Sequence, residues 1–392
     1  MVFIFYALAV LSLAVGSAAI YMTLIQALPV QWSYYHYFIR KPFTWAVLVA
    51  GVIGTLLMSW QIDELPLWTF PPLILMALAV VLAHRVHQEN AFKAVDFPSM
   101  ADDPLKLPLQ DNMELAVIEY DGVTKAFPLD YVIHHHIIND RFDDKLVALT
   151  YCAMCHSIIP FDVTDIGPLF VGSFKNANMI VADKKTRTFF QQASCESVIG
   201  KLHPYTLTMI PFQVLTWSEV KKLNPCPEVV KVTKQDFKAF ELPVKGLWKK
   251  VIANGLTPGL SSKNRDNTFS PRTHVVGITD KIANPQVVYL KDELLEQGVV
   301  NNEELGVVLV AVNGSVLGFK SSVEGEPVSI EPGASSTLCD TKSGTVWNVC
   351  GKFIKGEIES NLVPVAISDE YWFSWKLFHP GSQLVRLREK KS

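Results

Sequence analysis

The hydrophobic pattern divides the chain into an apolar N-terminal part and a longer mixed part. Three apolar runs, Val2–Leu28, Phe43–Trp60 and Leu67–Ala83, contain no Lys, Arg, Asp or Glu. Each is close to the ~20 residues that a helix needs to cross a bilayer. A buried helical hairpin of a soluble protein is the alternative, but three charge-free runs favour membrane helices. We therefore predict a three-helix transmembrane region over residues 1–85 and a linker over residues 86–113.

From residue 114 onward, short β-rich runs alternate with turn residues. Two amphipathic stretches, Leu129–Asn139 and Trp217–Leu223, place apolar residues at helical spacing. The predicted fold class is α+β: a strand-rich soluble unit that follows an all-α transmembrane region. The predicted strands include Leu115–Tyr120, Lys145–Tyr151, Leu169–Phe174 and Val307–Val312.

The soluble part contains an internal repeat. An aspartate is followed at the same spacing by an aromatic residue, and then by a glycine, in two places. Matched spacings in the same order indicate duplication rather than chance. We predict a first repeat over residues 114–232, a connecting segment over 233–272 and a second repeat over 273–388. The two sets are Asp183, Phe190 and Gly200, and Asp340, Trp347 and Gly356.

Charge and composition narrow the choice of partners. The net charge is −3 and the basic residues are scattered, so no nucleic-acid surface is expected. The positive mean hydropathy of +0.23 arises from the apolar runs. The expected partners are the lipid bilayer and either a membrane protein complex or a redox partner.

The side of the membrane on which the soluble part lies depends on flanking basic residues. Arg40 and Lys41 precede the second run, and Arg85 and Lys93 follow the third. If these two pairs lie on opposite sides of the bilayer, each side carries two basic residues. The charge bias then leaves the side of the soluble part undecided.

One turn of the first repeat carries reactive side chains. The predicted strand ending at Tyr151 runs into Cys152-Ala-Met-Cys155-His156. In the second repeat, the comparable strand turns at Asn313-Gly314, a two-residue hairpin signal without cysteine. Because a short hairpin suffices for the fold, the longer turn with two thiols marks the expected site of chemistry.

Several motifs between residues 102 and 387 resemble the prokaryotic domain-of-unknown-function family 3179. Ala153-Met154, Phe190 and Cys195 depart from the pattern of that family. The resemblance supports the fold and the position of the site and implies no activity. It implies an integral protein of a prokaryotic inner (cytoplasmic) membrane, and it favours an extracytoplasmic soluble part. The motifs are Tyr151–Cys155, His135 before Asn139-Asp140, Asn176-x-Asn178 with Asp183, and Tyr371–Trp375 leading to Pro380.

The favoured hypothesis for the turn is a metal site in a binding or electron-transfer module. Cys152 and Cys155 would supply two ligands, and His135 and His156 would complete the set. Thiolate and imidazole suit a soft transition metal, copper or zinc. His135 is on the predicted helix that leads into the cysteine-bearing strand, so it could fold back over the turn.

Three alternatives remain open. Cys152 and Cys155 could form a dithiol–disulfide couple, with Cys152 as the attacking thiol of a membrane-tethered oxidoreductase. Cys152, Cys155 and His156 also match the attachment signature of c-type haem, with Met154 or Met179 as a further axial ligand. In the third, the cysteines are structural and the protein is a non-catalytic subunit of a membrane complex. The sequence does not decide whether the protein is an enzyme.

Other candidate residues have simpler interpretations. Asn176, Asn178 and Asp183 are expected to make Asx turns and loop hydrogen bonds. A disulfide between Cys195 and Cys350, which occupy similar positions in the two repeats, is less expected than buried thiols.

Overall fold

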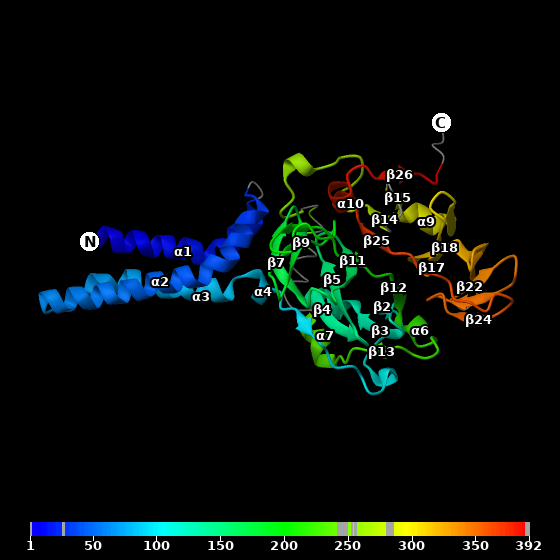
Figure 1. Cartoon of the computed structure of the whole chain (residues 1–392), viewed down its shortest axis with the longest axis horizontal. Coiled ribbons are helices and arrows are strands. Elements are labelled where there is room, and N and C mark those ends of the chain that lie inside the picture. The colour runs from blue at the N-terminus through cyan, green and yellow to red at the C-terminus, as the bar shows by residue number, and fades with distance from the viewer. Residues whose placement is uncertain are drawn as a thin grey trace.

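The computed structural model describes residues 2–25, 28–240, 250–251, 254, 257–279, 286–334 and 336–388. Three long N-terminal helices project from one side of a strand-rich domain as an elongated bundle (Figure 1). All three are long and apolar enough to cross a membrane, as predicted. These helices are α1 (Val2–Leu24), α2 (Val30–Ile62) and α3 (Phe70–Arg85).

The bounds of α2 differ from the prediction. The second apolar run was expected to begin at Phe43, but α2 begins at Val30 and continues through Pro42. At ~1.5 Å per residue its 33 residues span about 50 Å, more than the ~30 Å of a bilayer core. Helix α2 is therefore longer than a bilayer core requires, and its first third reaches the strand-rich domain.

This extension packs against the domain. Tyr34 and Tyr37 of α2 lie on a cluster that contains Phe170 and Phe189. The Tyr34 and Phe189 rings meet edge to face with centroids 5.2 Å apart, and the Tyr37 and Phe170 centroids are 5.6 Å apart. Aromatic pairs of this kind add stability beyond their buried area. The bundle is thus joined to the domain by packed side chains as well as by the chain itself.

The position of Arg40 corrects the charge argument. Its guanidinium is buried, donates to the Ala83 carbonyl at 3.1 Å and forms an ion pair with Glu89. Arg40 and Lys41 therefore lie at the same end of the bundle as Arg85, next to the domain. The expectation that the two basic pairs lie on opposite sides was wrong, because the chain runs along the bundle three times and so returns to the end where the first connection lies.

The first half of the domain contains three sheets, ordered β1-β4-β5-β6-β11, β10-β9-β8-β7 and β12-β2-β3-β13. In the last of these, β2 pairs antiparallel with β12 and β3, and β13 joins β3 in parallel. The strands are β1 (Val95–Asp96), β2 (Glu114–Tyr120), β3 (Val123–Pro128), β4 (Ile137–Phe142), β5 (Lys145–Cys152), β6 (Ser157–Asp162), β7 (Leu169–Lys175), β8 (Asn178–Asp183), β9 (Phe189–Gln191), β10 (Ser197–Ile199), β11 (Thr208–Met209), β12 (Phe212–Thr216) and β13 (Glu228–Val229).

The second half contains sheets ordered β16-β17-β18, β21-β22-β23-β24 and β25-β14-β15-β26, with a small hairpin of β19 and β20. Here β14 pairs antiparallel with β25 and β15, and β26 joins β15 in parallel. The strands are β14 (His274–Ile278), β15 (Val287–Leu290), β16 (Val299–Asn302), β17 (Val307–Val312), β18 (Ser315–Lys320), β19 (Ser322–Val323), β20 (Glu326–Pro327), β21 (Ile330–Gly333), β22 (Thr337–Asp340), β23 (Val346–Asn348), β24 (Phe353–Lys355), β25 (Ile367–Tyr371) and β26 (Gln383–Val385).

Short helices connect these strands. The helix expected over Leu129–Asn139 ends at His135, because the chain turns at His136 (φ 62°) into strand β4. The helix expected over Trp217–Leu223 is limited to its first four residues. Residues 241–249, 252–253 and 255–256 of the predicted connecting segment lie outside the described residues. The short helices are α4 (Gln88–Ala91), α5 (Leu129–His135), α6 (Trp217–Val220), α7 (Lys234–Phe240), α9 (Lys291–Gln297) and α10 (Trp372–Phe378), with 3₁₀ turns at Leu67–Thr69, Pro104–Lys106 and Ser262–Asn264.

Apolar side chains from both halves share the cores. One cluster combines Leu115 and Trp217 of the first half with Phe319 and Trp347 of the second. Another surrounds the two cysteines of the turn and includes Tyr371 and Phe373. The two halves are therefore parts of one packed unit.

Candidate functional site: a buried dithiol

The two cysteines of the turn lie side by side. Strand β5 ends at Cys152, β6 begins at Ser157, and Cys155 stands in the four-residue turn between them. The two Sγ atoms are 3.4 Å apart, and neither residue has any exposed surface. A disulfide bond is ~2.05 Å long, so a small movement of the turn brings the sulfurs to bonding distance.

The neighbouring β7–β8 turn provides polar partners for Cys155. Its thiol donates to the Ala177 carbonyl at 3.1 Å and accepts a hydrogen bond from Asn178 Nδ2, also at 3.1 Å. Cys152 Sγ lies 3.9 Å from the same carbonyl. The β7–β8 turn is tight, with Asn176 and Ala177 both at positive φ. It therefore holds one acceptor and one donor against the sulfurs.

Asn178 is itself fixed by a buried amide network. Its Nδ2 donates to Gln192 Oε1 at 3.0 Å, and its Oδ1 accepts from the Ala193 N–H at 3.2 Å. Gln192 Oε1 also accepts from Ser157, and Gln192 Nε2 donates to Thr150 Oγ1 at 3.2 Å. Asn178 was expected to make turn and loop hydrogen bonds, and in the structure its amide also donates to a cysteine sulfur.

Asp183, by contrast, has the turn role predicted for it. Its carboxylate accepts from the Thr188 N–H at 2.8 Å and from the Thr186 hydroxyl at 2.7 Å. These bonds close the β8–β9 turn. Asp183 is therefore a structural residue of the sheet that carries Asn178.

The two thiols have different acidities. Burial opposes ionisation of Cys152, but its hydrogen bond with Cys155 and hydrogen bonds from backbone N–H groups outweigh this effect and lower the pKa of Cys152. Burial raises the pKa of Cys155, and negative charge on Cys152 and Glu370 raises it further. The directions of these shifts favour the thiolate at Cys152 over that at Cys155.

The second half closes the site. Strand β25 lies beside β6, and the Tyr371 N–H donates to the Cys155 carbonyl at 2.8 Å. This pairing places Glu370 and Ser374 next to the thiols. Neither residue was identified from the sequence, and neither was Gln192. The sequence gives no indication of Glu370, because a polar strand such as Ile367–Tyr371 is typical of an exposed sheet edge. Ser374 was the one residue that could have been noticed, since it is a polar side chain inside an aromatic run.

His156 points away from a shared ligand position. Its ring stacks on Tyr371 with centroids 5.4 Å apart and meets His274 edge to face at 4.9 Å. Its Nδ1 lies 3.4 Å from the Tyr151 hydroxyl. Burial lowers the pKa of His156 to about 4, so the imidazole is neutral at pH 7. It packs as part of the seam between the two halves.

His135 lies on α5, where its ring meets Tyr131 and His134 edge to face at 4.6 and 4.8 Å. Burial, with the nearby His134, lowers the pKa of His135 to about 4. Across the described ranges, no three or more His, Cys, Asp or Glu side chains are grouped to hold a metal ion. The structure brings Cys152 and Cys155 together but does not add His135 or His156 as ligands.

The positions of the cysteines and histidines do not fit the metal ion or the haem that the sequence suggested. Zinc sites in proteins take three or four ligands, and this one offers two thiols. Attachment of haem needs thiols that a porphyrin can reach, but both are fully buried. All six cysteines are thiols in the structure, so Cys195 and Cys350 are not bonded to each other.

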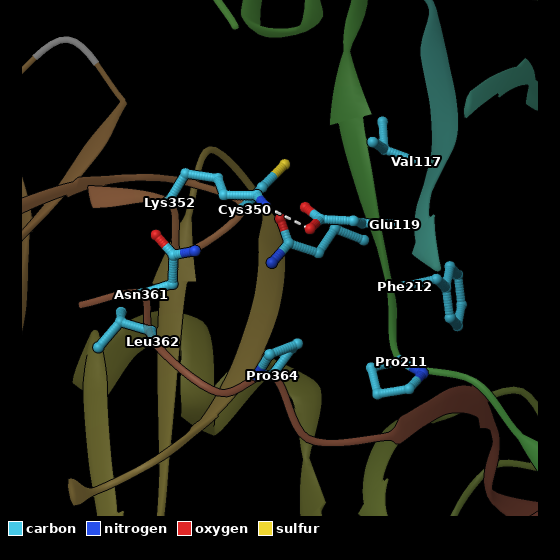
Figure 2. A pocket seen from close by; sticks show the side chains of 10 residues that line it. Val117, Glu119, Pro211, Phe212, Cys350, Lys352, Asn361, Leu362 and Pro364 are labelled. Carbon is cyan, nitrogen blue, oxygen red and sulfur yellow. Dashed lines mark ion pairs between the residues drawn. The ribbon is translucent and has the colours of Figure 1, made fainter. Parts of the chain in front are cut away.

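A pocket of about 170 Å³ opens elsewhere along the seam (Figure 2). It lies between β2, β12 and the segments around residues 350–352 and 361–364, and an ion pair of Lys352 with Glu119 borders it. Burial raises the pKa of Cys350 in this pocket to about 12, so its thiol stays protonated. The pocket has no second sulfur and does not resemble the dithiol site.

The fold and site define a class of protein: helices able to span a membrane, followed by a strand-rich domain of several sheets. The chain belongs to the family described as "Protein of unknown function (DUF3179)", whose sequence model matches residues 89–382. The match covers the strand-rich domain up to the start of β26 and leaves out α1–α3. No curated protein and no solved structure matches the chain.

Proposed function

We propose that the protein is a membrane-anchored thiol oxidoreductase in which Cys152 and Cys155 form a dithiol–disulfide couple. The observation that carries the proposal is the 3.4 Å contact between the two sulfurs, with Asn178 and Ala177 as their polar partners. Since neither thiol is exposed, any oxidant reaches them through a transient opening of the turn, and a small oxidant of the peroxide class requires the least opening. A protein disulfide could not reach these sulfurs without opening the turn.

The couple reacts in two steps. The Cys152 thiolate attacks the terminal oxygen of the peroxide, the O–O bond breaks, and Cys152 becomes a sulfenic acid as hydroxide or alkoxide leaves. The Cys155 sulfur then attacks the Cys152 sulfur and displaces hydroxide, which forms the disulfide. Two electrons pass from the sulfurs to the peroxide oxygens. The lower pKa of Cys152 assigns it the first step.

Mass spectrometry of the full-length protein in detergent tests this proposal. One equivalent of hydrogen peroxide is expected to remove two hydrogens and to link the Cys152 and Cys155 peptides. Cys155→Ser should instead stop at a sulfenic acid that dimedone traps, and Cys350→Ser should behave like the wild type. About one bound metal per chain, lost in Cys155→Ser, would replace the couple with the metal site. Absence of both metal and disulfide would leave a structural role as a partner subunit.

We further propose that the domain faces the cytoplasm. Lys41, Arg85 and Lys93 lie with Arg40 at the domain end of the bundle, and the α2–α3 connection carries Asp63 and Glu64. Basic residues concentrate on the cytoplasmic side of membrane proteins. This reverses the side that the family resemblance favours. In a reducing cytoplasm the thiols would rest as in the structure, and any disulfide would be transient.

Reporter fusions in a bacterial host distinguish the two sides. Green fluorescent protein at the C-terminus is expected to fluoresce, and alkaline phosphatase at the same point to be inactive. The same reporters placed after Glu64 should give the reverse pattern. An active C-terminal phosphatase would put the domain outside.

We also propose that the two halves arose by duplication. In each half, one sheet has two antiparallel pairings and one parallel edge strand. The turn at Asn313-Gly314, both at positive φ, takes the place of the cysteine turn. Asn313 donates to Glu219 of the first half, just as the cysteine turn contacts β25 of the second. Each half therefore closes the turn of the other, and one of the two turns carries thiols.

A further inference from the structure

Glu370 is a buried carboxyl that the two-step scheme above does not use. It has no exposed surface, and Ser368 donates to its Oε1 at 2.9 Å. Its Oε2 has no hydrogen-bond partner among the described residues. Burial of a carboxyl without full hydrogen bonding is costly, so a structural role alone does not account for it.

The strand pairing puts this carboxyl beside the dithiol. Tyr371 donates its N–H to the Cys155 carbonyl, so the preceding residue, Glu370, is held against the cysteine turn. The Ser374 hydroxyl lies close to both the Cys155 thiol and the Glu370 carboxyl. Neither contact has full hydrogen-bond geometry in this state. The hydroxyl can therefore turn toward either group.

We propose that Glu370 accepts, through the Ser374 hydroxyl, the thiol proton that Cys155 loses when the disulfide forms. The inference rests on the proposed dithiol couple and assigns it an internal proton acceptor. Cys155 needs one, because it is fully buried and must lose its proton before the S–O bond breaks and hydroxide becomes available as a base.

The proton and electrons balance with a peroxide as oxidant. After the Cys152 sulfenic acid has formed, the Cys155 proton passes to Ser374, and Ser374 gives its own proton to the Glu370 carboxylate. The Cys155 thiolate attacks the Cys152 sulfur, the S–S bond forms, and the S–O bond breaks with loss of hydroxide. The released hydroxide, a far stronger base than the Glu370 carboxylate, then takes this proton and leaves as water, so Glu370 ends as a carboxylate beside a neutral disulfide.

The ionisation of Glu370 suits this task. Burial raises its pKa to about 7, so near neutral pH it is both available as a base and able to hold the proton. The titratable groups facing it are Cys155, Asp369 and His379. Burial lowers the pKa of His379 to about 4, so it is neutral. Burial opposes ionisation of Asp369, but hydrogen bonds and charges from His274 and Lys291 lower its pKa, so it stays ionised.

The test is Glu370→Gln in the full-length protein, with closure of the disulfide measured against pH. Excess hydrogen peroxide makes the first step fast, so closure limits the rate. At about pH 8, closure is expected to slow at least tenfold, and the sulfenic acid should accumulate and be trapped by dimedone. The wild-type rate should rise through about pH 7, and the variant should lack this rise.

Stability measurements separate this role from a structural one. Because burial raises its pKa above that of an unfolded glutamate, Glu370 loses stabilising free energy as pH rises to about 7. Glu370→Gln, which is always neutral, should therefore gain thermal stability over the wild type at about pH 8 but not at pH 5. The matched control is Glu293→Gln, another buried glutamate of the second half that pairs with Arg386 instead. It should keep the wild-type closure rate and pH profile.

The outcomes are distinct. Unchanged closure in Glu370→Gln, with a normal disulfide, would overturn the proton-acceptor role and leave the couple standing. No disulfide in the wild type would overturn both. If closure is slow in Glu293→Gln as well, then replacing a buried glutamate of this half disturbs the turn in general. That result would also overturn the proton-acceptor role of Glu370.

Discussion

Replacing Gly200 or Gly356 by alanine is expected to destabilise the protein by about 3–5 kcal/mol in either half. Both glycines have φ of 129°, which an L-residue rarely adopts. A Cβ would lie 2.5 Å from the Thr188 Cα at the first position and 2.3 Å from the Thr345 Cα at the second. Because the obstructing atoms are backbone, no side-chain rotation relieves the overlap.

The measurement is the apparent Tm of the full-length protein in detergent at one scan rate, where a fall of about 10 °C is expected for each variant. Gly122→Ala is the matched control, since its φ is 78° and nothing lies within 4 Å of the added Cβ. It should cost about 1 kcal/mol. Unequal losses at Gly200 and Gly356 would count against the structural equivalence of the two halves. Losses no larger than that of Gly122→Ala would contradict the predicted overlap of the added Cβ with backbone atoms.

The sequence predicted the parts of the fold that local patterns encode. Charge-free runs identified the three N-terminal helices, and alternation with turn residues identified strands such as Val307–Val312. The hairpin at Asn313-Gly314 was predicted because that dipeptide tolerates positive φ at both positions. Element ends were less predictable. The helix before β4 stops at His135 because tertiary pairing recruits the following residues into a sheet.

The site was predictable only where it is local. Two cysteines on one turn marked its position, and the structure brings their sulfurs together. The partners of those sulfurs come from β8 and β25, which are remote in the sequence and are set by pairing between sheets. The histidines depend on tertiary packing in the same way. His135 and His156 are near the cysteines along the chain, but each packs against other aromatic rings.

Asn178→Ala is expected to be one of the most damaging single changes near the dithiol. Asn178 is fully buried, and its amide joins Cys155 to Gln192 and the Ala193 N–H. Its removal leaves the Ala193 N–H without a partner, at about 1–3 kcal/mol, and takes one hydrogen bond each from Cys155 and Gln192, at about 1 kcal/mol, so a loss of about 3–5 kcal/mol is expected. The apparent Tm of the detergent-purified protein measures it.

Asn178→Asp separates the structural from the chemical role of the same side chain. The carboxylate keeps an acceptor for the Ala193 N–H but replaces the donor to the Cys155 sulfur with a negative charge. Like charge disfavours a thiolate, so the pKa of Cys155, already raised by burial, should rise further. Disulfide closure should then slow at least tenfold at pH 7, about one pKa unit or more. Because the buried carboxylate also faces the Gln192 Oε1 acceptor, the loss of Tm should be at least as large as in Asn178→Ala. If Asn178→Asp forms the disulfide at the wild-type rate, Asn178 has only a structural role in the turn. A side chain that stabilises the Cys155 thiolate could not be replaced by an anion without slowing closure.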